Sequence, residues 1–186
     1  ISVNGVVVTE MGVKVTLGRD RVEYQGKRLG GDSLRYVLIN KPKGYGGKGG
    51  KKGKSVFSLL NERFKERLIA VDELEEKEMG LVVLTNDGRL SEGKRTQEKN
   101  GGSLYHLVLD KPITEKHLAI LKKGVKVSAG LVSALEVVVT AAGDAHEIGL
   151  RPSIDETGVV SSMLEPIGYK VMKNDRVMYL GHTKKD

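Results

Sequence analysis

The stretch that decides the fold runs from Gly80 to Gly88 and reads GLVVLTNDG. Its apolar run predicts a short buried strand, and the Thr-Asn-Asp-Gly that follows is typical of a turn. The segment just before it is strongly acidic, with five carboxylates in seven positions. These are Asp72, Glu73, Glu75, Glu76 and Glu78. An acidic cluster beside a core strand indicates either an active site built on carboxylates or a damaged active site.

The rest of the composition is that of an ordinary globular protein with a basic balance. A chain of 186 residues suits one large or two small domains and can bury a real core. The formal charge of +7 favours a polyanionic partner, with RNA or DNA the obvious candidates. No apolar run approaches the ~18 residues of a spanning helix, so we expect no membrane contact. The absence of cysteine excludes disulfides and Cys-based metal or nucleophile chemistry.

The domain organisation follows from where glycine and lysine gather. Residues 1–30 are short β-rich units separated by glycines, and a linker around residues 30–35 leads into a larger domain over 35–186. Residues 41–54 hold six lysines and six glycines without an acid, which predicts a flexible cationic loop. The chain begins at Ile1 rather than at a methionine, so we expect a preceding N-terminal piece such as a targeting peptide.

The larger domain alternates many strand candidates with few helices. Thr114 is expected to cap a helix that ends at Gly124, and Thr157 a last helix that ends at Gly168. Strands outnumber helices and are joined mostly by turns and loops. This pattern predicts the α+β class, with a mixed or antiparallel β-sheet and flanking helices.

Several stretches match one family together and in order. They are YVLINKPKG (Tyr36–Gly44), VFSLL (Val56–Leu60), GLVVLTNDG (Gly80–Gly88) and MLEPIGYKV (Met163–Val171). The chain resembles the RsuA/RluB-type ribosomal-RNA pseudouridine synthases, and residues 1–30 look like the second half of the S4-type RNA-binding domain of these enzymes. The resemblance implies a pseudouridine synthase-like mixed sheet with a cleft for RNA and a reaction without a cofactor.

The resemblance also implies where the chemistry would lie. In this family an aspartate, five residues before the glycine that opens the strand, serves to detach a uracil from the ribose C1′ and reattach it through C5. Counting back from Gly80 puts Glu75 at that place, and Tyr105 falls where the family has a tyrosine after its turn. We therefore assign Glu75, as a degenerate form of the aspartate, and Tyr105 as the candidate catalytic residues, with no metal.

Four departures from the family pattern argue against activity. Glu75 is one methylene longer than aspartate, and a misplacement of ~1 Å costs on the order of 100-fold in rate. Glu73 stands where the family has an arginine, so the loop repels phosphate. Ser103 replaces a family lysine, and residues 155–162 contain no base where the family has an arginine-rich run.

Three functions remain open at this point. The leading one is an RNA-binding, catalytically inactive homologue that acts on ribosomal RNA as a ribosome component or a ribosome-assembly factor. The alternative is an active synthase that uses Glu75, and the third is an RNA-binding module outside the ribosome. Expected partners are ribosomal RNA and ribosomal or assembly-factor proteins. The expected location is the ribosome, in an organelle such as the mitochondrion or in the cytoplasm.

The candidate RNA-binding residues are basic side chains in three regions. The S4-like piece and the lysine-rich loop provide most of them, and Arg176 comes from the last strand. The full set is Lys14, Arg19, Arg21, Lys27, Arg28, Lys41, Lys43, Lys48, Lys51, Lys52, Lys54 and Arg176.

Overall fold

The computed structural model describes residues 1–16, 19–29, 34–46, 54–60, 64, 67–92, 102–141 and 144–185. Contacts divide the chain into two compact units, Ile1–Leu34 and Arg35–Asp186. No helix among the described residues is long and apolar enough to cross a membrane. Each unit has its own sheet and is described by itself.

The first unit is a small four-stranded antiparallel sheet in the order β2-β1-β3-β4. Its strands are β1 (Ser2–Val3), β2 (Val6–Val7), β3 (Val22–Tyr24) and β4 (Lys27–Leu29). Gln25 and Gly26 both adopt positive φ between β3 and β4, the conformation that suits a tight two-residue hairpin. No described residue of this unit is buried.

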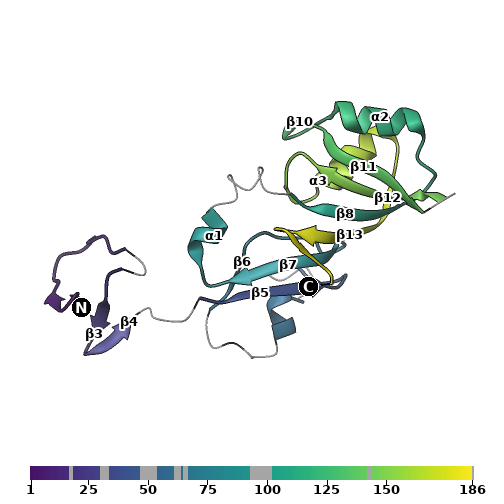
Figure 1. Ribbon diagram of the computed structural model, residues 1–186. Coiled ribbons are helices and arrows are strands. Elements are labelled where there is room, and N and C mark those ends of the chain that lie inside the picture. The colour runs from purple at the N-terminus through teal and green to yellow at the C-terminus, as the bar shows by residue number, and fades with distance from the viewer. Residues whose placement is uncertain are drawn as a thin grey trace. The chain divides into compact units, whose positions relative to one another are not determined.

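The second unit is built on an eight-stranded sheet in the order β11-β12-β8-β13-β7-β5, with β14 pairing to β13 and β6 to β7 (Figure 1). The strands of this sheet are β5 (Tyr36–Lys41), β6 (Ile69–Ala70), β7 (Met79–Thr85), β8 (Leu104–Leu109), β11 (Ala134–Ala141), β12 (Asp144–Pro152), β13 (Val171–Tyr179) and β14 (His182–Thr183). Two further strands, β9 (Val125–Val127) and β10 (Gly130–Val132), form a separate two-stranded sheet. The helices of the second unit are α1 (Gly88–Glu92), α2 (Glu115–Lys123) and α3 (Val159–Leu164), with 3-10 turns η1 (Val56–Leu60) and η3 (Glu165–Ile167). The pairing of β13 with β7 is parallel and its neighbours pair antiparallel, so the predicted α+β class with a mixed sheet is confirmed.

The strand β7 is apolar throughout because both of its faces are covered. Val82 and Leu84 belong to the main core cluster, whereas Leu81 and Val83 belong to a second cluster with Tyr179. A strand buried on two sides is expected to lack the alternation of polar and apolar residues. The uninterrupted apolar run LVVL is therefore typical of a central strand.

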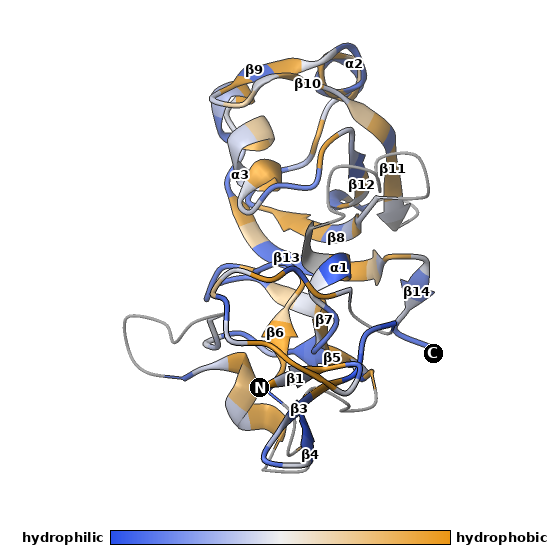
Figure 2. Cartoon of the chain, turned by 90° about the vertical axis from the view of Figure 1, so that its left-hand side faces the viewer, coloured by the Kyte–Doolittle hydropathy of each residue, from blue (hydrophilic) through white to orange (hydrophobic). Residues whose placement is uncertain are grey.

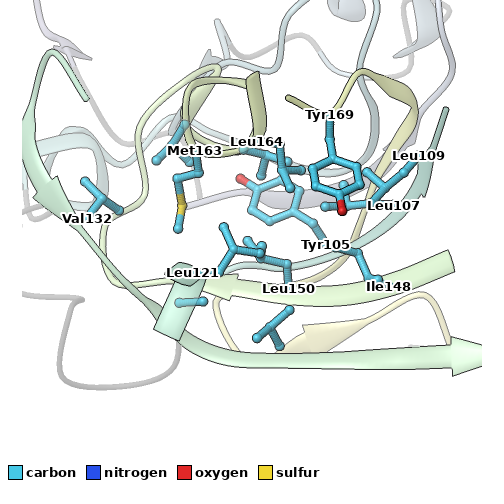
Figure 3. Packing of buried hydrophobic residues seen from close by; sticks show 14 of the residues in the cluster. Tyr105, Leu107, Leu109, Leu121, Val132, Ile148, Leu150, Met163, Leu164 and Tyr169 are labelled. Atoms are coloured by element: carbon cyan, nitrogen blue, oxygen red, sulfur yellow. The ribbon is translucent and has the colours of Figure 1, made fainter. Parts of the chain in front are cut away.

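The main core lies between the sheet and its helices. Figure 3 shows Tyr105 and Leu107 of β8 packed with Leu150 of β12, Leu121 of α2 and Met163 of α3. Hydrophobic residues accordingly line β8 and part of α3 (Figure 2).

The two predicted helix caps have different outcomes. Thr114 accepts a hydrogen bond from the His117 amide at the start of α2, and Gly124 ends this helix, as predicted. The prediction for Thr157 is wrong, because the N-cap of α3 is Gly158 in the left-handed conformation. The Thr157 hydroxyl instead donates to the Glu73 carbonyl at 2.9 Å. It therefore ties two loops together rather than starting the helix.

The turn after β7 fastens this strand to the start of β5. The Thr85 hydroxyl donates to the Arg35 carbonyl at 2.6 Å, and the Arg35 amide donates to Asn86 Oδ1 at 2.7 Å. The Asp87 amide donates to the Thr85 hydroxyl at 3.0 Å. The polar side chains of this turn therefore have a clear structural role.

Candidate functional site

A small pocket lies in the second unit between the loop after β6 and the loop before α3. Its lining is mostly polar, and the residues are Asp72, Glu73, Leu74, Glu78, Tyr105, Asp155, Glu156, Thr157, Gly158, Val159, Val160 and Arg176. The cavity volume is about 10 Å³, which is close to the least that holds one water molecule.

Arg176 of β13 is the cation of this pocket, and its side chain is 1% exposed. Its Nη1 and Nη2 donate to the two carboxylate oxygens of Asp72, the second at 2.9 Å. Its Nε donates to the Leu81 carbonyl at 2.8 Å, and its guanidinium lies 3.8 Å from the centre of the Tyr179 ring. Burial acts to lower the pKa of Arg176, but the hydrogen bonds and attraction of Asp72 raise it well above its usual range. Arg176 is therefore a fixed cation.

Arg176 comes close to β7 because β7 has a glycine at that point. Gly80 pairs with Arg176 in the parallel ladder, and a Cβ on Gly80 would lie 2.3 Å from the Arg176 carbonyl oxygen. Gly80 also has a φ of +116°, a conformation that residues with a side chain rarely adopt. The glycine that opens the strand is thus required by the packing of β7 on β13.

Tyr105 of β8 lines the same pocket and is buried. Burial raises the pKa of its hydroxyl to about 12, so the phenol stays protonated near neutral pH. The structure thus brings Tyr105 and Arg176 together, with Asp72 as the carboxylate that contacts Arg176.

Glu75, the predicted counterpart of the family aspartate, is not among the lining residues of the pocket. Its carboxylate is 37% exposed and pairs with Lys77 at 3.1 Å. A Cβ on Gly158 would lie 2.9 Å from Glu75 Oε1, so this carboxylate passes close to the backbone at the start of α3. The carboxylate that points at the buried cation is therefore three positions earlier in the chain.

The prediction that Lys41 binds RNA requires a correction, because Lys41 is 1% exposed. Its ammonium donates to the carbonyls of Tyr45 at 2.7 Å, Glu75 at 3.0 Å and Glu78 at 2.5 Å. Burial lowers the pKa of Lys41, and attraction from nearby carboxylates offsets part of this effect. Lys41 fixes the end of β5 to the acidic loop and has no ammonium hydrogen left for a phosphate.

Glu78 is a buried carboxylate in the acidic loop. Its Oε2 accepts the Glu75 amide at 2.8 Å, and its Oε1 accepts from Asn174 Nδ2 at 2.7 Å. Burial raises the pKa of Glu78 above its ordinary 4.5, although the backbone hydrogen bond opposes the change. With Asp72, Glu73, Asp155 and Glu156 it makes the pocket strongly acidic around one arginine.

The other predicted RNA-binding residues have varied positions. In the first unit, Lys14, Arg19, Arg21, Lys27 and Arg28 are exposed, and Arg21 pairs with Glu23 at 2.6 Å. Lys43 and Lys54 are exposed at the two ends of the lysine-rich loop, and the Lys54 ammonium lies 5.6 Å from the centre of the Tyr45 ring. Lys48, Lys51 and Lys52 lie outside the described residues. Arg176 is buried against Asp72, so its contact with RNA stays a prediction that depends on opening of the pocket.

Asp72 and Asp155 line the pocket, although no motif in the sequence marks either of them as a site residue. Counting back from Gly80 gives a position in the loop but not the direction of a side chain. The one feature of the sequence that could have indicated Asp72 as a pocket residue is its position, because it is the acid nearest to the end of β6. Asp155 accepts the Ser103 amide at 3.0 Å, a contact across 52 positions that no local pattern predicts. Among the described residues, no group of three or more His, Asp or Glu is arranged to hold a metal ion.

Comparisons with known proteins agree with this fold. No family model matches the sequence. An uncharacterized RNA pseudouridine synthase of Aquifex aeolicus is 31% identical over 132 residues, which cover 70% of this chain and 53% of the relative. The ribosomal large subunit pseudouridine synthase B of Bacillus subtilis is 28% identical over 184 residues, which cover 96% of this chain and 75% of the relative. A crystal structure of a pseudouridylate synthase aligns with a TM-score of 0.68 at 20% identity, over 95% of this chain and 76% of the other.

The mixed sheet and its helices define a pseudouridine synthase fold. The chain belongs to the RNA pseudouridine synthases of the RsuA and RluB type, which confirms the resemblance. It spans about half the length of the Aquifex relative. The degenerate catalytic motif and the S4-like character of the first unit stay predictions.

Proposed function

We propose that this protein binds ribosomal RNA as a ribosome component or assembly factor and does not form pseudouridine. The observation that supports this most is the position of Glu75, whose carboxylate pairs with Lys77 at 3.1 Å outside the pocket. A nucleophile or general base must reach the reacting atoms within about 3 Å. The residue at the family's catalytic position does not line the pocket that holds Tyr105 and Arg176.

The charge of the pocket supports the same proposal. Four carboxylates besides the buried Glu78 line it, and the one cation among its lining residues is already paired with Asp72. Pseudouridine synthesis needs a flipped nucleotide, whose phosphates carry negative charge into the site. An acidic pocket disfavours such a ligand, because its carboxylates repel the phosphates.

A second candidate function is pseudouridine synthesis by a different carboxylate. Asp72 lines the pocket with Tyr105, and both of its oxygens accept hydrogen bonds from Arg176. A carboxylate has about four lone-pair sites, so the two hydrogen bonds from Arg176 do not use all of them. Under this candidate the catalytic aspartate lies three positions before the family position, and Glu75 has no catalytic part.

One experiment separates the two candidates. Purified protein is incubated with ribosomal RNA transcripts, and pseudouridine is measured by mass spectrometry of the nucleosides. We expect no product from the wild type and none from Glu75→Asp. Product that disappears in Asp72→Asn and persists in Glu75→Gln would refute the binding function and support synthesis by Asp72.

The location is also a proposal. We infer an association with ribosomes, in an organelle such as the mitochondrion or in the cytoplasm, because the relatives include ribosomal large and small subunit pseudouridine synthases. Sedimentation of a cell extract through a sucrose gradient tests it. The protein should migrate with ribosomal subunits or their precursors, and a position only at the top of the gradient would contradict it.

A further inference from the structure

The end of β7 away from the pocket carries a basic surface with an exposed aromatic ring. Tyr36 of β5 pairs with Thr85, the last residue of β7, and is 55% exposed. Arg89 of α1 lies just after the turn, and its side chain is 70% exposed. Figure 1 shows α1 beyond this end of β7.

The registers of the two strand ladders place two more arginines near the same end of β7. In the β5–β7 ladder Arg35 immediately precedes Tyr36, so it lies beside Asn86. In the β6–β7 ladder Ile69 pairs with Thr85, so Arg67 lies beyond the end of β7 on its other side. Both arginines are exposed. Three arginines therefore come from three segments near the Thr85 end of β7, and the acids among the described residues of these segments are Asp87 and Glu92.

Asp87 holds the aromatic ring and Arg89 in fixed positions. The Tyr36 hydroxyl donates to Asp87 Oδ2 at 2.7 Å, and Arg89 donates from Nε to Oδ1 and from Nη2 to Oδ2, both at 2.9 Å. The hydrogen bonds from Arg89 and then from Tyr36 hold the pKa of Asp87 well below its usual range, so this clamp persists at neutral pH. The tyrosine is anchored by its hydroxyl while over half of the residue remains exposed.

We propose that this surface, defined by Arg35, Tyr36, Arg67 and Arg89, binds single-stranded RNA, with one base stacked on Tyr36 and the backbone along the arginines. Exposed aromatic rings between cations are the usual means of binding single strands, because every base has a face that can stack. A ring that is already fixed loses little freedom when a base stacks on it. The inference rests on the RNA-binding function proposed above and gives it a location.

The geometry separates this surface from the pocket. The pocket lies at the start of β7, where Gly80 pairs with Arg176, and the basic surface lies at its other end. A strand from Met79 to Thr85 places the two roughly 20 Å apart at ~3.3 Å per residue. A base stacked on Tyr36 therefore lies well away from the carboxylates of the pocket.

Fluorescence anisotropy with a labelled single-stranded RNA of about ten nucleotides tests the inference, within the usual site size of such proteins. Tyr36→Leu should weaken binding at least about fivefold, the loss expected from one stacked base. Tyr36→Phe keeps the ring and should retain most of the affinity. Leu135→Ala, which removes an exposed apolar side chain elsewhere, should change nothing. Arg67→Gln should reduce the slope of log K against log salt by about 0.7.

The outcomes distinguish this inference from the proposed function. Wild-type protein that binds no RNA overturns both. Binding that survives Tyr36→Leu but fails when Lys27 and Arg28 become serine overturns the inference alone. A loss in Tyr36→Phe equal to that in Tyr36→Leu overturns the stacking role. Equal displacement of the RNA by polyglutamate would show a general site for acidic polypeptides and also overturn it.

Discussion

The two ends of β7 carry similar polar residues in opposite arrangements. At the start of the strand Arg176 is buried, and acidic side chains line the pocket around it. At the other end Arg89 is exposed, and its carboxylate partner Asp87 is held by two donors. A basic formal charge over the whole chain therefore says little about the site that the family uses. The charges at the two ends of this strand say more, because the proposed basic surface would attract a polyanion and the acidic pocket would repel it.

The contrast predicts that removal of the arginine is far more damaging at the pocket end. Arg176→Met leaves the Asp72 carboxylate, whose side chain is only 15% exposed, without its partner and should cost about 3 kcal/mol of unfolding free energy. Arg89→Gln, at a solvated position, should cost much less. Urea denaturation monitored by circular dichroism measures both. The double variant Asp72→Leu with Arg176→Met should recover part of the loss, and equal losses for Arg176→Met and Arg89→Gln would contradict the comparison.

A second prediction concerns the close approach of the strands at the pocket end. Gly80→Ala adds a methyl group 2.3 Å from the Arg176 carbonyl and forces a side chain to adopt φ +116°. Backbone strain and overpacking together should cost roughly 2–4 kcal/mol. The control is Gly88→Ala at the other end, where a Cβ would meet no atom within 4 Å. Thermal unfolding should separate the two variants clearly, and equal midpoints would refute the packing argument.

A third prediction uses the buried carboxylate of Glu78. Its folded pKa is raised above 4.5, so ionisation of Glu78 reduces stability at neutral pH, and this loss is relieved as the pH falls towards 4.5. Glu78→Gln should stabilise the protein at pH 7 by on the order of 1 kcal/mol. The Asn174 amide can rotate so that Asn174 Oδ1, which has no hydrogen-bond partner among the described residues, accepts from the new amide.

The measurement for Glu78 is the unfolding free energy of both proteins between pH 4.5 and 7. The advantage of the variant should shrink as the pH falls, because the wild-type carboxyl then becomes neutral as well. Glu165→Gln, at an exposed position, serves as the control and should show no such trend. A constant difference at every pH would contradict the role of ionisation.

The sequence predicted the central strand and the cap at Thr114 because both follow from local patterns. An apolar run followed by turn residues is sufficient for β7, and a threonine before an apolar helix face is sufficient for α2. It did not predict that Lys41 is buried, since a lysine in a glycine-rich stretch reads as a solvated cation. The three carbonyls that hold Lys41 come partly from a loop more than thirty positions away, which no local pattern reveals.

The candidate site shows even more clearly that local sequence patterns do not reveal contacts between residues far apart in the chain. Spacing from Gly80 located the acidic loop but assigned its function to Glu75, whereas the structure turns Asp72 towards Arg176. Which carboxylate points inward depends on the path of the chain after β6 and on the partner 104 positions away. Tyr105 was found because it follows the turn at a family spacing, and its side chain lines the pocket as expected of a residue at that position.

The smallest effect is expected for Glu75→Ala, and it is the most direct test of which carboxylate matters. Glu75 is 37% exposed and pairs with the exposed Lys77, so loss of this surface ion pair should change the unfolding free energy by less than about 1 kcal/mol. RNA affinity should stay the same or rise slightly, because one negative charge near the pocket is removed and no described contact on the basic surface is touched. Anisotropy titration of Glu75→Ala beside Tyr36→Leu measures the contrast. A Glu75→Ala variant that loses RNA while Tyr36→Leu keeps it would make the pocket end the binding end, and the difference between the two ends of β7 would then be the reverse of the one proposed.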